Sequence, residues 1–193
     1  TPLVMFNPHP FDCMLKATVH ATIAAAENET GDAVFLQKIR AERTNVHDKY
    51  DTLVYTRVPA MGYTTVMLHE GEPAPEEASP LRVTQTTLEN GRLRAQFDEA
   101  TGSLASLALD GRESLSAPAR LLLMDIAHVD TWAHNVFAFD REIGAIERPA
   151  FTILENGPVR ASLRVVRTNG RTTVSEIYRL YRDGDQLEVD VRL

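Results

Sequence analysis

The stretch Leu187-Glu188-Val189-Asp190-Val191-Arg192-Leu193 alternates apolar and charged side chains without a break. Successive side chains of a β-strand point to opposite faces of a sheet, so this pattern predicts a half-buried strand. Two similar runs precede it, and the dipeptides Asn169-Gly170 and Asp183-Gly184 separate the three runs. Dipeptides of this kind between alternating runs are the strongest short-range hairpin signal. Residues 158–193 are therefore predicted to form a three-stranded meander.

The N-terminal part of the chain follows the same period of two. Residues 13–23 alternate almost strictly and predict one long strand, and residues 33–40 predict the strand that returns beside it as a hairpin. Two further strands are expected at 53–58 and 63–69, joined by a tight corner that contains Pro and Gly. Together these strands predict a small β-sandwich domain over residues 1–70.

A change of composition divides the chain. Residues 71–80 hold three prolines, three acids and no large apolar residue, which is typical of a stiff, extended linker. Beyond it the β pattern returns, with a hairpin expected between 93–97 and 104–109 around Gly102. No segment has the period of a long amphipathic helix. The sequence therefore predicts an all-β fold in which residues 81–193 form a second, larger β domain.

Composition excludes several classes of partner. The 193-residue chain carries a net charge of -7, and nucleic acid or an anionic membrane would require a basic surface instead. No apolar run approaches the roughly 20 residues that span a bilayer. The lone Cys13 cannot form an internal disulfide, which favours a reducing, cytoplasmic location. Both ends are strand-like and the first residue is Thr1, so we expect this chain to be a piece of a larger protein.

One segment, His128 to Asn135, gathers polar side chains around the only Trp of the chain. Asp130, Trp132 and His134 are the candidate substrate-binding residues, because in a sugar site an indole face packs against a pyranose ring while carboxylate and amide groups bind its hydroxyls. Two other interpretations stay open. Trp132 could fill the core while Asp130 caps a turn. Alternatively, His128, Asp130 and His134 could bind a metal ion, for which sequence shows no geometry.

Several acidic residues could supply the pair of carboxylates that a glycosidase needs, but no independent feature of the sequence supports any of them. Asp125 and Asp130 lie close in sequence, and Asp98 and Glu99 share a turn. A glycosidase needs two acids that flank one bond, one of them with a raised pKa, whereas an acidic turn is usually just solvated. No catalytic residue and no metal ligand is therefore assigned to this chain.

Six segments, taken in order, resemble one family. They are Leu3–Phe11 with its Asn-Pro, the Pro-x-x-Gly-Tyr corner in Val58–Tyr63, Leu88–Leu104 with Phe-Asp and Thr-Gly-x-Leu, Asp130–His134, Gly157–Arg160, and Ile177–Tyr181. This ordered set resembles the C-terminal β region of glycoside hydrolase family 38, the α-mannosidases. The segment Asp130–His134 departs slightly from the family's pattern, because Ala133 stands where the family more often has Gly.

The resemblance implies an architecture and a role. It implies a small β-sandwich followed by the N-terminal part of a galactose-mutarotase-like supersandwich. It also implies that zinc and a nucleophilic Asp belong to an upstream α/β barrel and to no position here. The parent protein would hydrolyse terminal α-mannosidic bonds with retention. This piece would be its non-catalytic β portion, which buttresses the barrel and borders the sugar site.

Two alternatives belong to other classes of protein. The first is a stand-alone carbohydrate-binding β module without hydrolase activity, which would bind sugar by itself. The second is a purely structural module that binds no sugar. A homo-oligomer is also possible, because an unpaired sheet edge can pair with a second copy.

Overall fold

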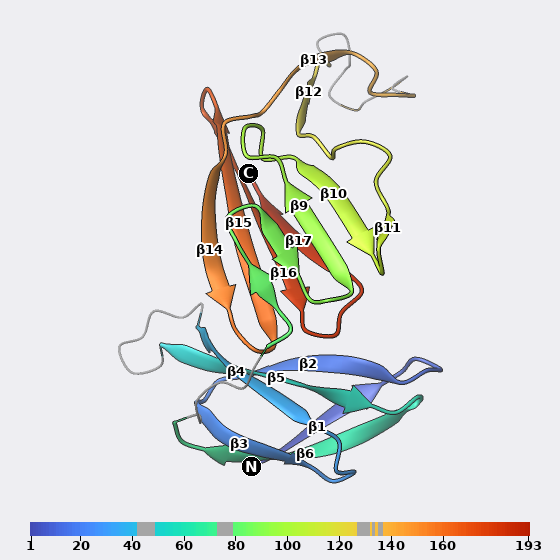
Figure 1. The fold of residues 1–193 in the computed structure, drawn as a ribbon, viewed down its shortest axis with the longest axis vertical. Helices are drawn as coiled ribbons and strands as arrows, with labels where there is room; N and C mark the ends of the chain where they lie inside the picture. The colour runs from blue at the N-terminus through green and yellow to red at the C-terminus, as the bar shows by residue number, and fades with distance from the viewer. Residues whose placement is uncertain (42–48, 73–78, 127–131, 133, 135–136) are drawn as a thin grey trace.

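The computed structural model describes residues 1–41, 49–72, 79–126, 132, 134 and 137–193. This described part of the chain consists of strands, turns and bends and contains no helix, so the predicted all-β fold class is confirmed. Figure 1 shows two bodies: a small unit formed by the described residues up to 72, and a large unit formed by those from 79 onward. No described segment forms a helix long and apolar enough to cross a membrane.

The small unit is a sandwich of two three-stranded antiparallel sheets, with the orders β1-β6-β3 and β2-β5-β4. The strands are β1 Pro2–Asn7, β2 Cys13–Val19, β3 Ile23–Asn28, β4 Val34–Arg40, β5 Tyr50–Val58 and β6 Gly62–Glu70. Alternate residues point inward and enclose a core of Ile23, Val54, Val66 and Leu68. The predicted small β-sandwich is present.

The path of the chain between these two sheets differs from the prediction. The strand expected over 13–23 ends early, and the chain resumes as β3 from Ile23 in the other sheet. Thr52 on β5 fixes the break, because its hydroxyl donates to the carbonyl of Ala21 (2.7 Å) and accepts from the N–H of Ile23 (3.0 Å). The expected hairpin with 33–40 is wrong, since β4 pairs with β5 instead.

The corner at 59–62 joins β5 to β6 and carries the chain from one sheet to the other. Asn7, whose side chain is buried, donates from Nδ2 to the carbonyls of Val58 (3.2 Å) and Pro59 (3.0 Å). The corner itself requires a left-handed residue, and Met61 takes a φ of 49° there. The Asn of the Asn-Pro segment therefore holds the corner in place.

The large unit is a second, bigger sandwich. Its sheets have the orders β11-β10-β9-β8-β7 and β14-β15-β16-β17. The strands are β7 Arg82–Val83, β8 Thr87–Glu89, β9 Leu93–Phe97, β10 Leu104–Leu109, β11 Arg112–Glu113, β14 Ala150–Asn156, β15 Arg160–Asn169, β16 Thr172–Tyr181 and β17 Leu187–Arg192. The core between them contains Leu81, Leu88, Leu93, Ala95, Phe97, Leu104, Ala161, Leu163, Val165, Tyr178 and Leu180.

The meander predicted over 158–193 is confirmed as β15, β16 and β17. The turn between the first two strands has Gly170 at a φ of 60°, a conformation that glycine adopts without steric cost. The long strand β14 was not predicted: it pairs with β15 through a register shift between Ile153 and Glu155 that interrupts its alternation. The short strands β7, β8, β11 and β13 were not predicted either. The hairpin of β9 and β10 around Gly102 is confirmed too.

Part of the inner face of β17 lies uncovered. Val189 pairs with Tyr178 and Val191 with Glu176, so both valines share the face of two buried residues. Both are nevertheless about half exposed, at 47% and 53%. The opposing sheet therefore covers the first residues of this strand better than its last ones.

Glu113 organises the turn that follows β11. Its Oε1 accepts the N–H groups of Leu107 (3.0 Å), Ser114 (2.9 Å) and Leu115 (2.9 Å), and the hydroxyl of Ser106 donates to its other oxygen. The bond from Ser106 first, and the backbone bonds after it, lower the pKa of Glu113 from its ordinary 4.5 to about 2. All four donors favour the charged carboxylate over the acid.

This pKa gives a pH-dependent prediction. Because the folded pKa is depressed, the stabilisation is fully present above pH 4.5 and is lost as the pH falls towards 2. We therefore expect Glu113→Gln to lose stability relative to the wild type at pH 6 but not at pH 2, as measured by urea denaturation across this range. Glu99→Gln, a substitution of an exposed acid in another turn, is the control. Parallel pH curves for Glu113→Gln and the wild type would contradict the assigned role.

The two units share a contact with its own buried cluster, formed by Ile39, Leu53, Tyr55, Val159 and Tyr181. The first three belong to the small unit and the last two to the large one. Burial, with the charge of Asp183 as a second cause, raises the pKa of Tyr55 to about 12. Of the predicted linker 71–80, residues 73–78 lie outside the described residues, so the domain boundary stays a prediction.

Polar contacts surround this cluster. The Oε1 of Gln37 accepts the N–H groups of Val159 (3.0 Å) and Arg160 (2.7 Å) in the other unit. Lys16 forms an ion pair with Glu188, also across the contact. The predicted two-part organisation is thus accompanied by a specific, well-packed junction.

Candidate functional site

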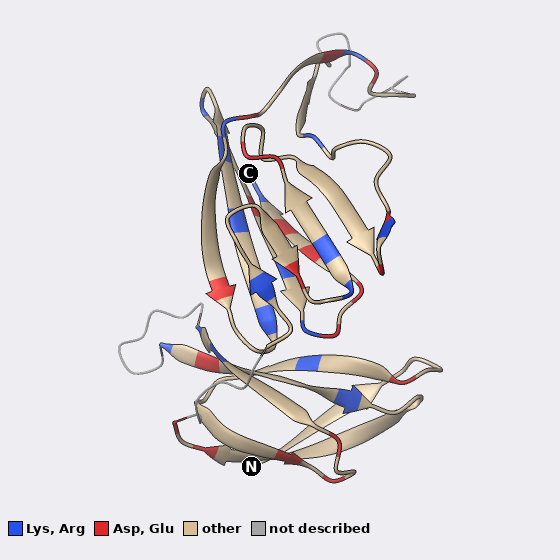
Figure 2. Ribbon diagram, in the orientation of Figure 1, with Lys and Arg blue, Asp and Glu red and all other residues tan. Residues whose placement is uncertain are grey.

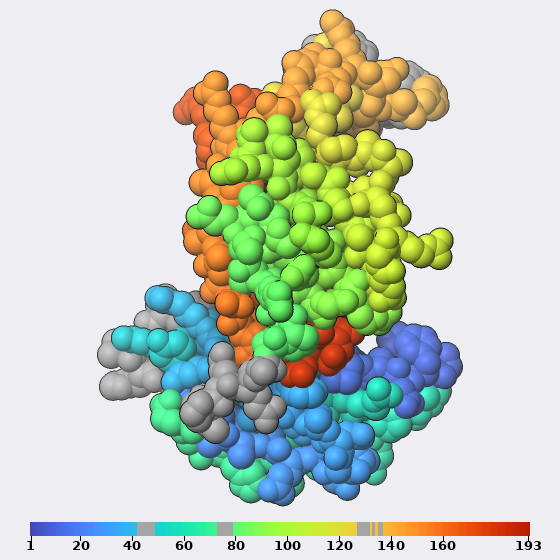
Figure 3. All heavy atoms as spheres, in the orientation of Figure 1, coloured from blue at the N-terminus to red at the C-terminus, as the bar shows by residue number. Residues whose placement is uncertain are grey.

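The two described residues of the segment predicted to bind sugar, Trp132 and His134, lie on an arm that leaves the large sandwich (Figure 1). We define the arm as the described residues of 121–146, with β12 Leu122–Met124 and β13 Glu142–Ala145 as its paired stem. Figures 1 and 3 show it at the end of the molecule opposite the small unit. Trp132 is 81% exposed and Phe137 is 94% exposed. Ile126, Phe139 and Ile143 are also exposed, so the arm presents apolar side chains to solvent.

Ion pairs and backbone bonds hold the stem. Asp125 pairs with Arg141 (3.0 Å) and Arg120 with Glu142 (3.2 Å), and each pair joins the two sides of the stem. The N–H of Asp125 also donates to the carbonyl of Arg141 (2.9 Å). Functional groups of a β scaffold are commonly presented outside its sheets, on segments that the sheets position.

Of the three predicted site residues, the structure describes two, Trp132 and His134. Asp130 lies outside the described residues, and so does His128, so the proposed ligand set for a metal is untested. Trp132 and His134 are both exposed. The interpretation of Trp132 as a core residue is therefore wrong. Within the described ranges, no group of three or more His, Cys, Asp or Glu side chains could hold a metal ion.

Asp130 lies outside the described residues, and the three described candidate carboxylates, Asp98, Glu99 and Asp125, show no sign of a catalytic pair. Asp98 accepts the hydroxyl (2.8 Å) and the N–H (2.7 Å) of Thr101, and these bonds lower its pKa, whereas a general acid needs a raised one. Glu99 is exposed in the same turn. Asp125 forms an ion pair with Arg141.

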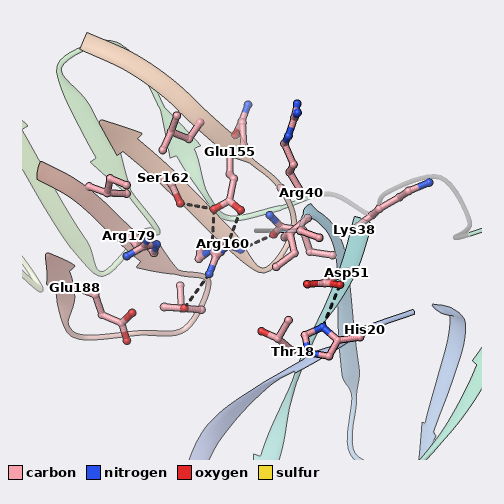
Figure 4. Close-up of a pocket in the computed structure, with 18 residues that line it drawn as sticks. Thr18, His20, Lys38, Arg40, Asp51, Glu155, Arg160, Ser162, Arg179 and Glu188 are labelled. Atoms are coloured by element: carbon pink, nitrogen blue, oxygen red, sulfur yellow. Dashed lines mark hydrogen bonds and ion pairs between the residues drawn. The ribbon is translucent and has the colours of Figure 1, made fainter. Parts of the chain in front are cut away.

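A cleft of about 820 Å³ lies at the junction of the two units. Figure 4 shows polar side chains converging on it from β2, β4 and β5 on one side and from β14 to β17 on the other. The charged and imidazole side chains that line it are His20, Lys38, Arg40, Asp51, Glu155, Arg160, Arg179 and Glu188. No sequence pattern predicted this cleft.

The cleft contains one polar network on each unit. On the small unit, Nδ1 of His20 lies 3.2 Å from Oδ1 of Asp51. On the large unit, Arg160 donates to both oxygens of Glu155 (2.7 and 2.6 Å), and the hydroxyl of Ser162 also donates to this carboxylate. Burial lowers the pKa of Arg160, but the bonds and charge of Glu155 outweigh it and raise the pKa overall. The hydrogen-bonding groups of the second network are therefore largely satisfied, as those of a structural brace would be.

Comparison with known proteins identifies the family. Residues 88–193 match the Glycosyl hydrolases family 38 C-terminal domain. The fold is similar to the crystal structure of an alpha-mannosidase from Enterococcus faecalis V583, with a TM-score of 0.57 and 14% sequence identity. That similarity covers 98% of this chain but 29% of the other, so the chain spans less than a third of that protein's length. No curated protein sequence matches the chain. Because more than half of its residues match this one domain, the chain belongs to glycosyl hydrolase family 38.

Proposed function

We propose that this chain is the non-catalytic β portion of a retaining α-mannosidase, and that its arm borders the sugar site of the whole protein. The exposed aromatic face of the arm supports the proposal most directly. Trp132 and Phe137 are among the most exposed large apolar side chains of the described residues, although large aromatic side chains are usually strong contributors to a core. Their position on a braced stem suits a surface that meets a ligand or another part of the protein.

In this role the arm binds substrate and does not react with it. The indole of Trp132 stacks on the C–H face of a mannose ring, and Asp130 and His134 bind its hydroxyls. Hydrolysis with retention passes through a covalent glycosyl intermediate on a carboxylate, which this proposal assigns to another part of the protein. Mannosides are thus the ligands of the whole enzyme.

Zinc, which the family implies, has no fitting site among the described residues. We assign it to the catalytic part of the parent protein and derive no step through it here. The two sandwiches buttress that part. A cytoplasmic location is proposed as well, since the chain's only cysteine, Cys13, is free.

The kinetic test uses a longer family 38 polypeptide that contains this chain. We expect Trp132→Ala to lower kcat/KM for a 4-nitrophenyl α-mannoside about tenfold, because losing one stacking contact costs about 1–1.5 kcal/mol. Tyr50→Ala, which removes an exposed aromatic side chain far from the arm, is the matched control. Unchanged kinetics in a folded Trp132→Ala variant would put the indole outside the sugar site.

The cleft favours a second candidate function, a stand-alone carbohydrate-binding module. Its volume and hydroxyl-binding side chains suit a mono- or disaccharide. Ligand-observed NMR of the 193-residue chain with mannose, mannobiose and galactose separates the two functions. Saturation transfer that is lost in Asp51→Asn would favour a binding module that uses the cleft. Transfer that is lost in Trp132→Ala would favour the arm, and no transfer at all would leave this piece as scaffold.

A further inference from the structure

Strand β17 lies at the edge of the β14-β15-β16-β17 sheet. Among the described strands it pairs with β16 alone, so no described strand takes up the backbone N–H and C=O groups along its other side. All six residues of β17 pair with β16 in unbroken register, so no bulge twists this edge away. A regular strand edge of this kind readily accepts another strand.

The two faces of β17 carry different side chains. Val189 and Val191 lie on the inner face and are 47% and 53% exposed, and Leu193, next on that face by alternation, is 93% exposed. Asp190 and Arg192 alternate with them on the outer face. Figure 2 shows both acidic and basic residues on this strand. A strand that pairs with β17 therefore has to match an apolar row on one face and a charged row on the other.

We propose that the occupant is β17 of a second copy of this chain, paired antiparallel so that the two four-stranded sheets become one continuous sheet. A two-fold axis perpendicular to the sheet passes beside Val191, which lies opposite its own counterpart. In this register Asp190 of each copy lies opposite Arg192 of the other, and Val189 lies opposite Leu193. Opposite charges then meet on the outer face and apolar side chains meet on the inner face.

The charges of β17 select this register. A perpendicular two-fold axis keeps each face on its own side, so the axis has to pass beside one residue. Centring the pair on Val189 sets Glu188 opposite Asp190, and centring it on Asp190 or on Arg192 sets that residue opposite itself. Each of these three registers opposes like charges, which destabilises a strand pair. Centring on Val191 leaves like charges only in diagonal positions, where they lie farther apart than the attractive pairs.

The carboxylate of Asp190 is well placed for this contact. It lies 3.7 Å from Nη2 of Arg179 on β16 and 3.4 Å from Nη2 of Arg192 in its own strand. Its side chain is still 34% exposed, so it can accept a further guanidinium from the free side of β17. The ion pairs on the outer face would then continue from one copy to the other.

The expected dimer is weak and reversible. Residues 189–193 of each copy overlap in this register, which gives a small interface and a dissociation constant on the order of 100 μM. Each chain also carries a net charge of -7, so the two copies repel each other as whole molecules. The local charge pairs and the strand hydrogen bonds have to outweigh that repulsion.

Sedimentation velocity of the 193-residue chain over a wide concentration range tests the proposal. We expect a monomer–dimer equilibrium that Asp190→Arg and Arg192→Asp each weaken about 30-fold, because each change turns two attractive cross-strand pairs into repulsive ones. An equimolar mixture of the two variants should form a heterodimer at least as tightly as the wild type dimerises, because every Arg then lies opposite an Asp. Recovery on mixing also guards against a folding defect in either variant.

Arg57→Asp is the matched control. The side chains of Arg57 and Arg192 are similarly exposed, at 59% and 66%, and Arg57 lies on β5 of the small unit. This variant makes the same change of net charge as Arg192→Asp and should dimerise like the wild type.

Three outcomes would overturn the proposal. A wild-type chain that stays monomeric at several hundred micromolar would leave the edge to a strand of a longer polypeptide or of a different protein. A dimer that persists in both Asp190→Arg and Arg192→Asp, or that Arg57→Asp weakens equally, would not depend on the charges of β17. Variants that lose the dimer but form no heterodimer on mixing would exclude the register centred on Val191.

Discussion

Replacing Glu176 by alanine is expected to lower the free energy of unfolding by about 3–5 kcal/mol, the usual cost of leaving one member of a buried ion pair alone. Arg167 and Glu176 form an ion pair inside the large sandwich, with side chains 1% and 8% exposed. The hydroxyl of Tyr178 donates to the same carboxylate (3.1 Å). Without Glu176, the guanidinium of Arg167 would remain in the core beside that phenol. Urea denaturation at neutral pH measures the loss.

Two controls make this expectation specific. The double substitution Arg167→Met with Glu176→Leu should recover most of the lost stability, because it removes both charges and fills the space with apolar atoms. Asp110→Ala breaks the exposed ion pair with Arg92 and should change stability little. If Glu176→Ala and Asp110→Ala had the same small effect, Arg167 would not be held as a buried cation. The raised pKa of Tyr178, caused first by burial and then by Glu176, should fall back in part in the Glu176→Ala variant.

Gly157→Ala is expected to destabilise the chain by about 3 kcal/mol, through overpacking and two weakened hydrogen bonds. A Cβ at this position would lie 2.6 Å from Nε2 of Gln37 and closer still to other atoms of that side chain. Gln37 is buried and cannot simply swing away, because its Oε1 accepts the N–H groups of Val159 and Arg160. The added methyl group therefore acts on the junction between the two units. Thermal and urea denaturation both report the loss.

Gly184→Ala is the matched control for this substitution. Its Cβ would meet the nearest atom, the carbonyl oxygen of Tyr181, at 3.4 Å, an ordinary contact that needs little adjustment. We expect Gly184→Ala to cost well under half as much. Equal losses for the two variants would show that glycine-to-alanine changes in loops of the large unit, and not Gln37, explain the effect.

The parts of the fold that depend on local signals were predictable, and the parts that depend on distant contacts were not. The meander follows from two turn dipeptides and strict alternation, all within 158–193. The break after β2 depends on Thr52, a residue from a strand about thirty positions later, whose hydroxyl ties down both sides of the bend. Alternation continues through that bend, so the sequence predicted one strand where the structure has two.

The same distinction between local signals and distant contacts applies to the two candidate sites, the arm and the cleft. The arm was identifiable because its unusual residues lie within one short segment around Trp132. The cleft was not, because it brings His20 and Asp51 together with Glu155 and Arg160 only when the two units dock. On β15 and β16 the lining residues occupy the outward positions of a strand pattern, which sequence reasoning assigns to solvent. Knowledge of the docking would have been needed to see them as one surface.

The buried cluster at the junction also determines how the molecule comes apart. Ile39, Leu53 and Tyr55 are covered by Val159 and Tyr181, so opening either unit exposes apolar surface on the other. The two units therefore act as one cooperative folding unit, with a single melting transition and coincident signals from different probes. Backbone amides protected most strongly against hydrogen exchange should then be found in both units, on β5 as well as on β15 and β16.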